Sequence, residues 1–440
     1  MKKICLTVIG LYLLFLHAFS QSITIDSTID FYPQKRIKDT TGSYKVKHLR
    51  LDEISIVSSY YTQNGNHSAV TGGIGTEQVT DLSNGIDLKF VSVDKGEHKH
   101  TFTTGFGFDH HTSASAAYVN KSGASKTGGT RIYPSIDWTT ENEKKGSSFG
   151  LGTYYSTEYN YKSFGADIHL SQKTNDKNGE FSAKGQAYFD KVTMILPSEL
   201  IPAPITIVAP SGTTTITTAS GRTTVLSTGG QIVSTTAGKH IPTSPRNTFT
   251  ASLSYSQIIN TKLQLAFLLD AVTQSGYLGL PFHRVYFSNG KDTVENLPSS
   301  RFKLPIGIRA NYFMGDNIIL RSYYRFYTDD WGLSSHTVSL EVAIKITPFF
   351  SVSPFYRYYQ QTAANYFAPY EAHTANEKYY TSNYSLSAFQ SNYFGAGIRV
   401  APPNGVFGWQ GLNSLEMRYG HYSQTTDLVS DVISFEFKFK

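Results

Sequence analysis

Three adjacent residues, Asp109-His110-His111, carry the side chains most suited to chemistry in this 440-residue sequence. An imidazole beside a carboxylate can shuttle a proton or bind a metal ion. Neighbouring residues on a strand point to opposite faces, however, so both histidines cannot face one ion while the strand continues. No serine or further carboxylate stands at a spacing that completes a triad. We therefore assign no catalytic residue, no metal ligand and no cofactor, and we expect no enzyme activity.

A second group is the pair Asp329 and Asp330, followed by Trp331 and Gly332. Two adjacent carboxylates could hold Ca²⁺ or Mg²⁺ together with loop carbonyls. The alternative is a structural turn, in which Asp initiates the turn, Gly332 supplies the unusual backbone angles and Trp331 packs nearby. We favour the turn.

The third group is basic. Arg301, Lys303 and Arg309 share one face of the alternating segment 301–312, and Arg321 and Arg325 share one face of the next segment. Like charges directly opposite each other destabilise a sheet. Lumen water, an acid such as Glu341 or Glu416, or a bound anion should therefore compensate. Two interpretations stay open, a basic pore wall that favours anions and a structural ladder paired to an inward-folded loop.

The elements that position these groups are strands. From Asp52 onward apolar and polar residues alternate with period two almost without interruption, which indicates β-structure. The alternating runs predict sixteen strands, with fourteen to eighteen as bounds: 52–62, 77–92, 99–111, 131–140, 147–157, 160–172, 179–195, 246–258, 261–272, 300–313, 317–328, 335–346, 349–360, 390–400, 413–424 and 429–439.

The links between these runs alternate between short and long, as periplasmic turns and extracellular loops do in outer-membrane barrels. The exceptions are 158–159, short on the loop side, and 401–412, long on the turn side. A soluble propeller would also alternate, but it should show a motif of fixed period, and none is found. We therefore predict an all-β fold, a single antiparallel transmembrane β-barrel in the outer membrane of a Gram-negative cell.

Composition agrees with a barrel. Aromatic residues make up 14% and charged residues 16%, and the mean hydropathy is −0.26, because only every second strand residue needs to face lipid. Residues 1–20 read as a signal peptide with an A-x-S cleavage site, and 21–51 as a periplasmic arm. The only cysteine, Cys5, falls within the signal peptide. The basic excess is spread along the chain and gives no case for nucleic acid.

Two segments of the predicted barrel 52–440 stand out. The last strand has Ile433, Phe435, Phe437 and Phe439 on one face, the alternating aromatic pattern that barrel assembly machinery recognises. The Thr-rich loop 196–245 has high strand propensity but low complexity, so a β-ribbon and a disordered loop are equally favoured.

The chain resembles an uncharacterised family of bacterial outer-membrane barrels, known only as a domain of unknown function. The resemblance covers most of the chain from Asp52, and the matching stretches are 64–73 (NGNHSAVTGG), 244–249 (SPRNTF), 275–278 (SGYL), 297–301 (LPSSR), 324–332 (YRFYTDDWG) with 335–337 (SHT), and 358–364 (YYQQTAA). It implies an outer-membrane location and no established activity. It also suggests a redox-linked role in the cell envelope.

These inferences give one favoured function and two others. We expect a passive, porin-like channel for small solutes with an anion preference. The alternative is a structural or partner-binding barrel that serves as an envelope platform, and the least favoured is a hydrolase at the rim. The expected partners are outer-membrane lipid, the barrel assembly machinery and an envelope protein that the sequence does not identify.

Overall fold

The computed structural model describes residues 47–112, 129–197, 200, 212–217, 223–228 and 242–440. The predicted signal peptide and most of the predicted arm 21–51 therefore lie outside the described residues. The first strand begins at Lys47, within the span expected for the arm.

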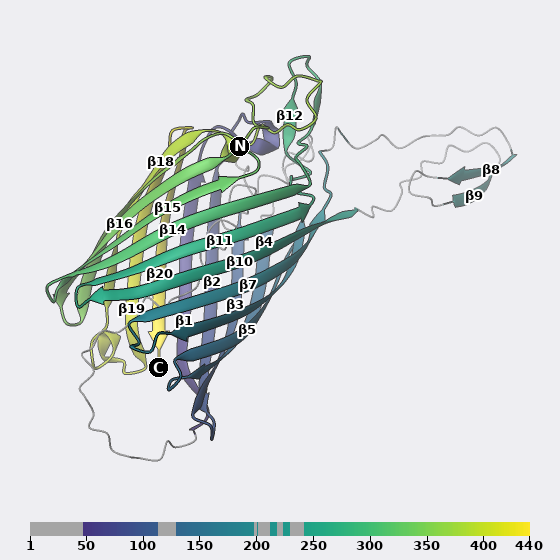
Figure 1. Ribbon diagram of the computed structural model, residues 1–440. Helices are drawn as coiled ribbons and strands as arrows, with labels where there is room; N and C mark the ends of the chain where they lie inside the picture. The colour runs from purple at the N-terminus through teal and green to yellow at the C-terminus, as the bar shows by residue number, and fades with distance from the viewer. Residues whose placement is uncertain (1–46, 113–128, 198–199, 201–211, 218–222, 229–241) are drawn as a thin grey trace, which may run out of the picture.

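Sixteen antiparallel strands form one closed barrel, which confirms the predicted fold (Figure 1). In order around the barrel they are β1 (Lys47–Asn64), β2 (Val79–Val93), β3 (His98–His111), β4 (Gly129–Asn142), β5 (Ser147–Glu158), β6 (Tyr161–Lys173), β7 (Gly179–Thr193), β10 (Thr243–Asn260), β11 (Leu263–Gly276), β14 (Ser300–Met314), β15 (Ile318–Asp329), β16 (Ser334–Thr347), β17 (Phe350–Gln361), β18 (Phe389–Val400), β19 (Leu412–Gln424) and β20 (Leu428–Phe439).

The ends of the chain close the barrel. The first strand pairs with the last from Ile54 opposite Phe439 to Asn64 opposite Val429. This pairing satisfies the backbone groups of both strands, and a barrel without a free edge is the form in which a sheet can cross a bilayer.

The elements outside the barrel are small. Strands β8 (Gly212–Thr217) and β9 (Thr223–Thr228) form a two-stranded ribbon inside the Thr-rich loop, and β12 (Arg284–Tyr286) pairs with β13 (Asp292–Val294). The described residues also form three short 3-10 turns, η1 (Ala69–Thr71), η3 (Tyr384–Leu386) and η4 (Val406–Gly408). No helix in the described part of the chain is long and apolar enough to span a membrane.

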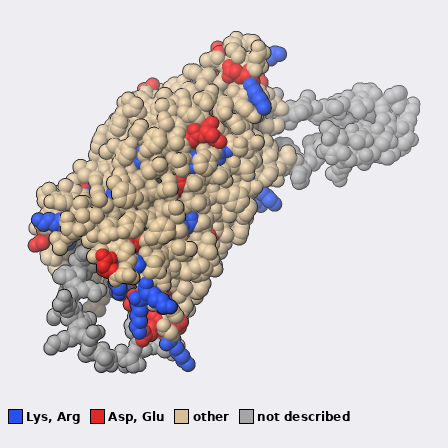
Figure 2. Space-filling view, viewed as in Figure 1, with Lys and Arg blue, Asp and Glu red and all other residues tan. Residues whose placement is uncertain are grey.

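The period-two pattern sets the two faces of the wall. Large apolar side chains such as Phe106, Ile136 and Phe267 lie on the outside and are each about half exposed, at 51%, 54% and 51%. Figure 2 shows an outer wall that is largely free of charge, with Lys, Arg, Asp and Glu gathered mainly toward the two ends. Charge on the lipid-facing side of such a wall costs about 2–4 kcal/mol per Arg or Lys at mid-membrane, so this distribution suits a bilayer.

Candidate functional site: the lumen and its rim

The five predicted basic residues share the inner face of β14 and β15. Residues opposite one another in an antiparallel pair lie on the same face, and Arg309 stands opposite Tyr323, Arg321 opposite Asn311, and Arg325 opposite Gly307. Most outward positions between them are apolar, as Ile306 illustrates at 46% exposed, and Ser322 is an exception. Arg309 and Arg321 are thus diagonal neighbours rather than direct partners, which reduces their repulsion.

At the rim, Arg301 belongs to a buried cluster rather than to an open wall. Its Nε donates to Asp329 Oδ2 at 3.0 Å, and its guanidinium lies 4.2 Å above the ring of Trp331. The Arg301 and Asp329 side chains are 10% and 0% exposed. A buried guanidinium held by a carboxylate and an aromatic face is a structural contact.

The carboxylate of Asp329 is also the centre of a turn. Its Oδ1 accepts hydrogen bonds from the backbone N–H of Trp331 at 2.9 Å and of Leu333 at 3.1 Å. Its Oδ2 accepts from the Tyr327 hydroxyl at 2.6 Å as well as from Arg301. Gly332 has φ +84°, which other residues rarely adopt. With both oxygens of Asp329 engaged, and Asp330 exposed, the geometry favours the turn over a cation site.

Deeper in the barrel, acids on neighbouring strands form ion pairs with inward-facing arginines. Glu341 accepts from Arg321 Nη1 at 2.7 Å and from Arg418 Nη2 at 2.5 Å, and Arg418 Nη1 donates to Glu416 at 3.1 Å. Arg309 lies 5.8 Å from the ring of Tyr323. Among the described residues no carboxylate forms an ion pair with Arg309, so its charge acts on the lumen.

Sequence reasoning missed three further arginines on the inner face. Arg357, Arg399 and Arg418 lie on β17, β18 and β19, opposite Tyr393, Glu416 and Ser434. Each is the only arginine of its strand, so the sequence shows no cluster of basic residues there. The alternation of apolar and polar residues in each strand could have identified them, because charged residues stand at the positions that face the lumen.

Asp109, His110 and His111 are separated as their alternation requires. His110 points outward and contacts Thr130 Oγ1 at 3.0 Å. Asp109 points inward and accepts from Arg131 at 2.6 Å and from the Tyr133 hydroxyl at 2.7 Å. Because Asp109 is engaged elsewhere, it does not orient either histidine.

His111 lies instead between two other carboxylates. Its Nδ1 is 3.7 Å from Asp81 Oδ2, and its Nε2 is 3.3 Å from Glu158 Oε1. All three side chains are buried, at 6%, 4% and 10% exposed. No hydroxyl group contacts His111 among the described residues, where its ring lies between the carboxylates of Asp81 and Glu158.

Three loops pack together at the long-loop end, and we name them the cap: residues 65–78, 277–299 and 362–388. Arg284 Nη1 donates to the Val70 carbonyl at 2.7 Å, and Thr381 Oγ1 donates to Glu295 Oε2 at 2.7 Å. His67 stacks on Tyr384 with ring centroids 3.8 Å apart. In Figure 1 the part of the cap that carries β12 rises above the barrel rim.

The cap is anchored to inward-facing barrel residues. Gln63 Nε2 donates to the Glu77 carbonyl at 3.1 Å, and Gln361 Nε2 donates to the Ser387 carbonyl at 2.5 Å. Trp331 and Leu386 share an apolar core with Tyr327, Leu333 and Ala364. The cap therefore covers the lumen side of the rim near β1 and β14–β18.

Burial raises the pKa of Glu77, in the first cap loop, to about 7, although a backbone hydrogen bond from His67 opposes the shift. The side chain is 3% exposed, and its Oε2 lies 2.3 Å from where a Cβ on Gly65 would stand. This loop therefore holds a carboxyl group that titrates near neutral pH.

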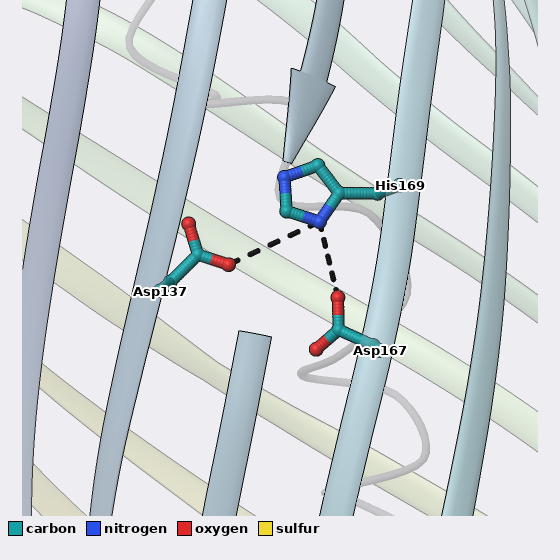
Figure 3. Close-up of side chains that lie close together, drawn as sticks. All are labelled: Asp137, Asp167 and His169. Atoms are coloured by element: carbon teal, nitrogen blue, oxygen red, sulfur yellow. Dashed lines mark hydrogen bonds and ion pairs between the residues drawn. The ribbon is translucent and has the colours of Figure 1, made fainter. Parts of the chain in front are cut away.

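Across the barrel, Asp137 from β4 and Asp167 and His169 from β6 point toward one another (Figure 3). His169 Nδ1 lies 3.0 Å from Asp167 Oδ1 and 3.9 Å from Asp137 Oδ2. One ligand atom from each residue lies within 4.8 Å of the others, a spacing that could hold a cationic group or a metal ion. Lys184 Nζ is 3.4 Å from Asp167 Oδ1.

Glycines on β5, the strand between β4 and β6, allow the side chains of Asp137, Asp167 and His169 to approach one another. Gly152 on β5 stands opposite both Asp137 and Asp167, and Gly150 stands opposite His169. A Cβ on Gly152 would come within 2.3 Å of Asp167 Oδ2, and one on Gly150 within 2.1 Å of His169 Nε2. Sequence reasoning missed this cluster, because Asp137 lies on a different strand from Asp167 and His169 and meets them only in the folded sheet.

Solved outer-membrane proteins resemble the barrel only loosely. Pseudomonas aeruginosa OccK1 (OpdK) aligns over 88% of this chain and 97% of its own, with 7% identity and a TM-score of 0.39. A BenF-like porin from Pseudomonas fluorescens Pf-5 aligns over 88% and 98%, with 8% identity and a TM-score of 0.40. A bacterial polysaccharide outer-membrane secretin aligns over 88% and 98%, with 7% identity and a TM-score of 0.42. Likeness at this level carries no functional conclusion.

No curated protein matches the sequence. The closed barrel with its apolar exterior makes the protein a multi-pass β-barrel of the outer membrane. A family model matches residues 100–427, which is most of the chain and includes the five predicted basic residues and the second and third loops of the cap. The chain belongs to the family described as "Protein of unknown function (DUF3570)".

Proposed function

We propose that the protein is a passive channel for small hydrophilic solutes, with a preference for anions. The observation that carries the proposal is the charge of Arg309 on the inner face of β14, which has no ion-pair partner among the described residues. Barrels of sixteen strands are wide enough for an aqueous channel unless loops fill them. Rings or walls of arginine and lysine favour anions in pores.

The physical basis of the preference is focusing of the field. Low-dielectric walls concentrate the potential of lumen charges and raise the local concentration of ions of opposite sign. Ion pairs of Arg321 and Arg418 with Glu341 reduce the net positive charge of this face, so the anion preference should be mild. Salt screens charges over roughly 8 Å at physiological ionic strength, so the anion preference should weaken as the salt concentration rises.

Planar-bilayer conductance of the purified barrel tests the proposal. A salt gradient should give a reversal potential of anion sign, and Arg309→Ser with Arg321→Ser should move it toward cation preference. Lys345→Gln, which removes an inward charge near the turn end of β16, is the matched control and should change it less. A sealed barrel would remove the channel proposal, and a reversal potential that ignores both substitutions would remove the anion preference.

The cap supports a second candidate, a structural or partner-binding barrel that acts as an envelope platform. Three loops distant in sequence are joined by buried hydrogen bonds, including Arg284 to Val70 and Thr381 to Glu295. A fixed surface of this kind suits docking of an envelope protein, and the family resemblance suggests a redox-linked one. Absence of conductance in the folded barrel would favour this candidate. We propose no enzyme activity, and the rim hydrolase is the least favoured function.

A further inference from the structure

The lumen has an acidic side. On β2–β7 inward-facing carboxylates outnumber inward-facing cations, and Asp87, Asp137 and Asp167 lie away from the ends of their strands. No ion pair to Asp87 is formed within the described part of the chain, and Asp137 has only His169, at 3.9 Å. Lys184 offsets part of this charge by its contact with Asp167. We call Asp87, Asp137 and Asp167 the acidic wall.

The opposite balance holds on β14–β19. The inward arginines there are Arg309, Arg321, Arg325, Arg357, Arg399 and Arg418, which we call the basic wall. Among the described residues of these strands, the inward acids away from the rim are Glu341 and Glu416, which form ion pairs with Arg321 and Arg418. Inward Asp270 on β11 and Glu436 on β20 lie beside this wall rather than within it.

Strand order places the two walls across the lumen from each other. In a closed ring of sixteen strands, each strand faces the one eight positions away, so β2 faces β14, β4 faces β16 and β6 faces β18. Asp87 therefore faces the strand of Arg309. Asp137 and Asp167 face strands flanked by those of Arg321, Arg357 and Arg418.

We propose that this lumen selects small zwitterionic solutes, which carry an ammonium group at one end and a carboxylate at the other; the inference rests on the channel proposed above. Opposite charges on facing walls create a field across the lumen rather than along it. A solute with two separated charges gains from both walls when it turns its ammonium toward the acidic wall. A neutral solute of the same size gains from neither wall.

The acidic wall has a defined place for the ammonium group. Asp137 Oδ2 and Asp167 Oδ1 both point toward His169 Nδ1 (Figure 3), and the Asp137 side chain is 40% exposed. Gly150 and Gly152 keep the wall between the two strands free of side chains. An ammonium donates three hydrogen bonds, so it can contact these carboxylates while its solute remains in the lumen.

Liposome swelling measures the selection directly. We would compare 4-aminobutanoate, a zwitterion at neutral pH, with 4-hydroxybutanamide, an uncharged solute of nearly the same size. At low ionic strength the zwitterion should enter faster by about twofold or more. Asp137→Asn with Asp167→Asn, and separately Arg309→Ser with Arg321→Ser, should each bring the ratio of rates close to one.

The controls separate this inference from the channel proposal. Glu180→Gln removes an inward carboxylate at the end of β7, opposite Lys173, and should leave the ratio unchanged. Equal rates in the wild-type barrel, or a ratio that survives loss of both walls, would overturn the zwitterion inference while the channel stands. If neither solute enters, the channel proposal itself fails.

Reversal potential provides a second readout. Loss of the acidic wall should strengthen anion preference, and loss of the basic wall should weaken it, so the two shifts have opposite signs. Shifts of the same sign would contradict two facing walls. If the double acidic variant does not fold, as judged by gel mobility before boiling, Asp137→Asn alone gives the same test with a smaller shift.

Discussion

Replacing Asp329 by alanine should destabilise the whole barrel, although the residue lies at the rim. Its carboxylate is fully buried and holds the guanidinium of Arg301, itself 10% exposed. It also accepts the backbone N–H groups of Trp331 and Leu333. The substitution leaves a buried positive charge without its partner and two amide groups without an acceptor.

The expected loss is about 3–5 kcal/mol, the usual result of removing one member of a buried ion pair. Arg301 and Asp329 belong to neighbouring barrel strands, β14 and β15, so the loss should appear in global unfolding rather than only in a loop. Asp330→Ala is the matched control, because Asp330 is the adjacent carboxylate but is exposed. It should change stability by less than about 1 kcal/mol.

Urea unfolding of the barrel in lipid vesicles, followed by mobility of unboiled samples on a gel, measures the free energy of unfolding. Adding Arg301→Gln to Asp329→Ala should recover part of the loss, because the unpaired charge is removed. If Asp329→Ala and Asp330→Ala unfold at the same urea concentration, the rim cluster does not stabilise the barrel and the reasoning is wrong.

Three further results are expected. The folded barrel should migrate faster on a gel unboiled than boiled, because β1 pairs with β20 and leaves no edge for detergent; extraction by carbonate alone would contradict an integral barrel. Burial raises the pKa of Glu77 to about 7, so the folded loop keeps a proton that the unfolded chain releases above its ordinary pKa of 4.5. Loop 65–78 should therefore lose about 3 kcal/mol as pH rises from 4.5 through 7. The protection factors of its amides, which correct for the intrinsic increase of exchange with pH, should fall in wild type but not in Glu77→Gln. Ser288→Cys, in the cap, should react with an impermeant maleimide on whole cells. Lys144→Cys, in a short turn, should react only after the outer membrane is opened. The reverse pattern would mean that the barrel has the opposite orientation in the membrane.

The strands could be predicted because a barrel wall has a simple rule. Apolar residues must face lipid at every second position, so β14 and β16 are visible as uninterrupted alternation in 301–312 and 338–346. The rule does not fix where a strand ends once it leaves the membrane. The first strand accordingly begins at Lys47, where the sequence has no clean period.

The sequence indicated the basic residues of β14 and β15 in the lumen but not the acidic ones of β4 and β6. Arg301 and Arg309 stand on one strand and attract attention together, whereas Asp137 and Asp167 stand on separate strands and meet only through the register of β4, β5 and β6. Which acid neutralises which base is also a matter of register. Asp329 forms an ion pair with Arg301 on the neighbouring strand, although the local sequence around Asp329 and Asp330 suggests only a turn or a cation site.

The cap has a consequence for the order of folding. The hydrogen bond from Arg284 to Val70 joins residues separated by 214 positions, and Thr381 and Glu295 are separated by 86. Contacts between segments so far apart carry a large entropic cost until the intervening chain is ordered. The cap should therefore assemble last, after the first and final strands have met. The amides of Asn296 and Tyr380 donate to each other's carbonyls across two cap loops. Their protection during refolding would then report that the barrel has already closed, so it marks the end of insertion.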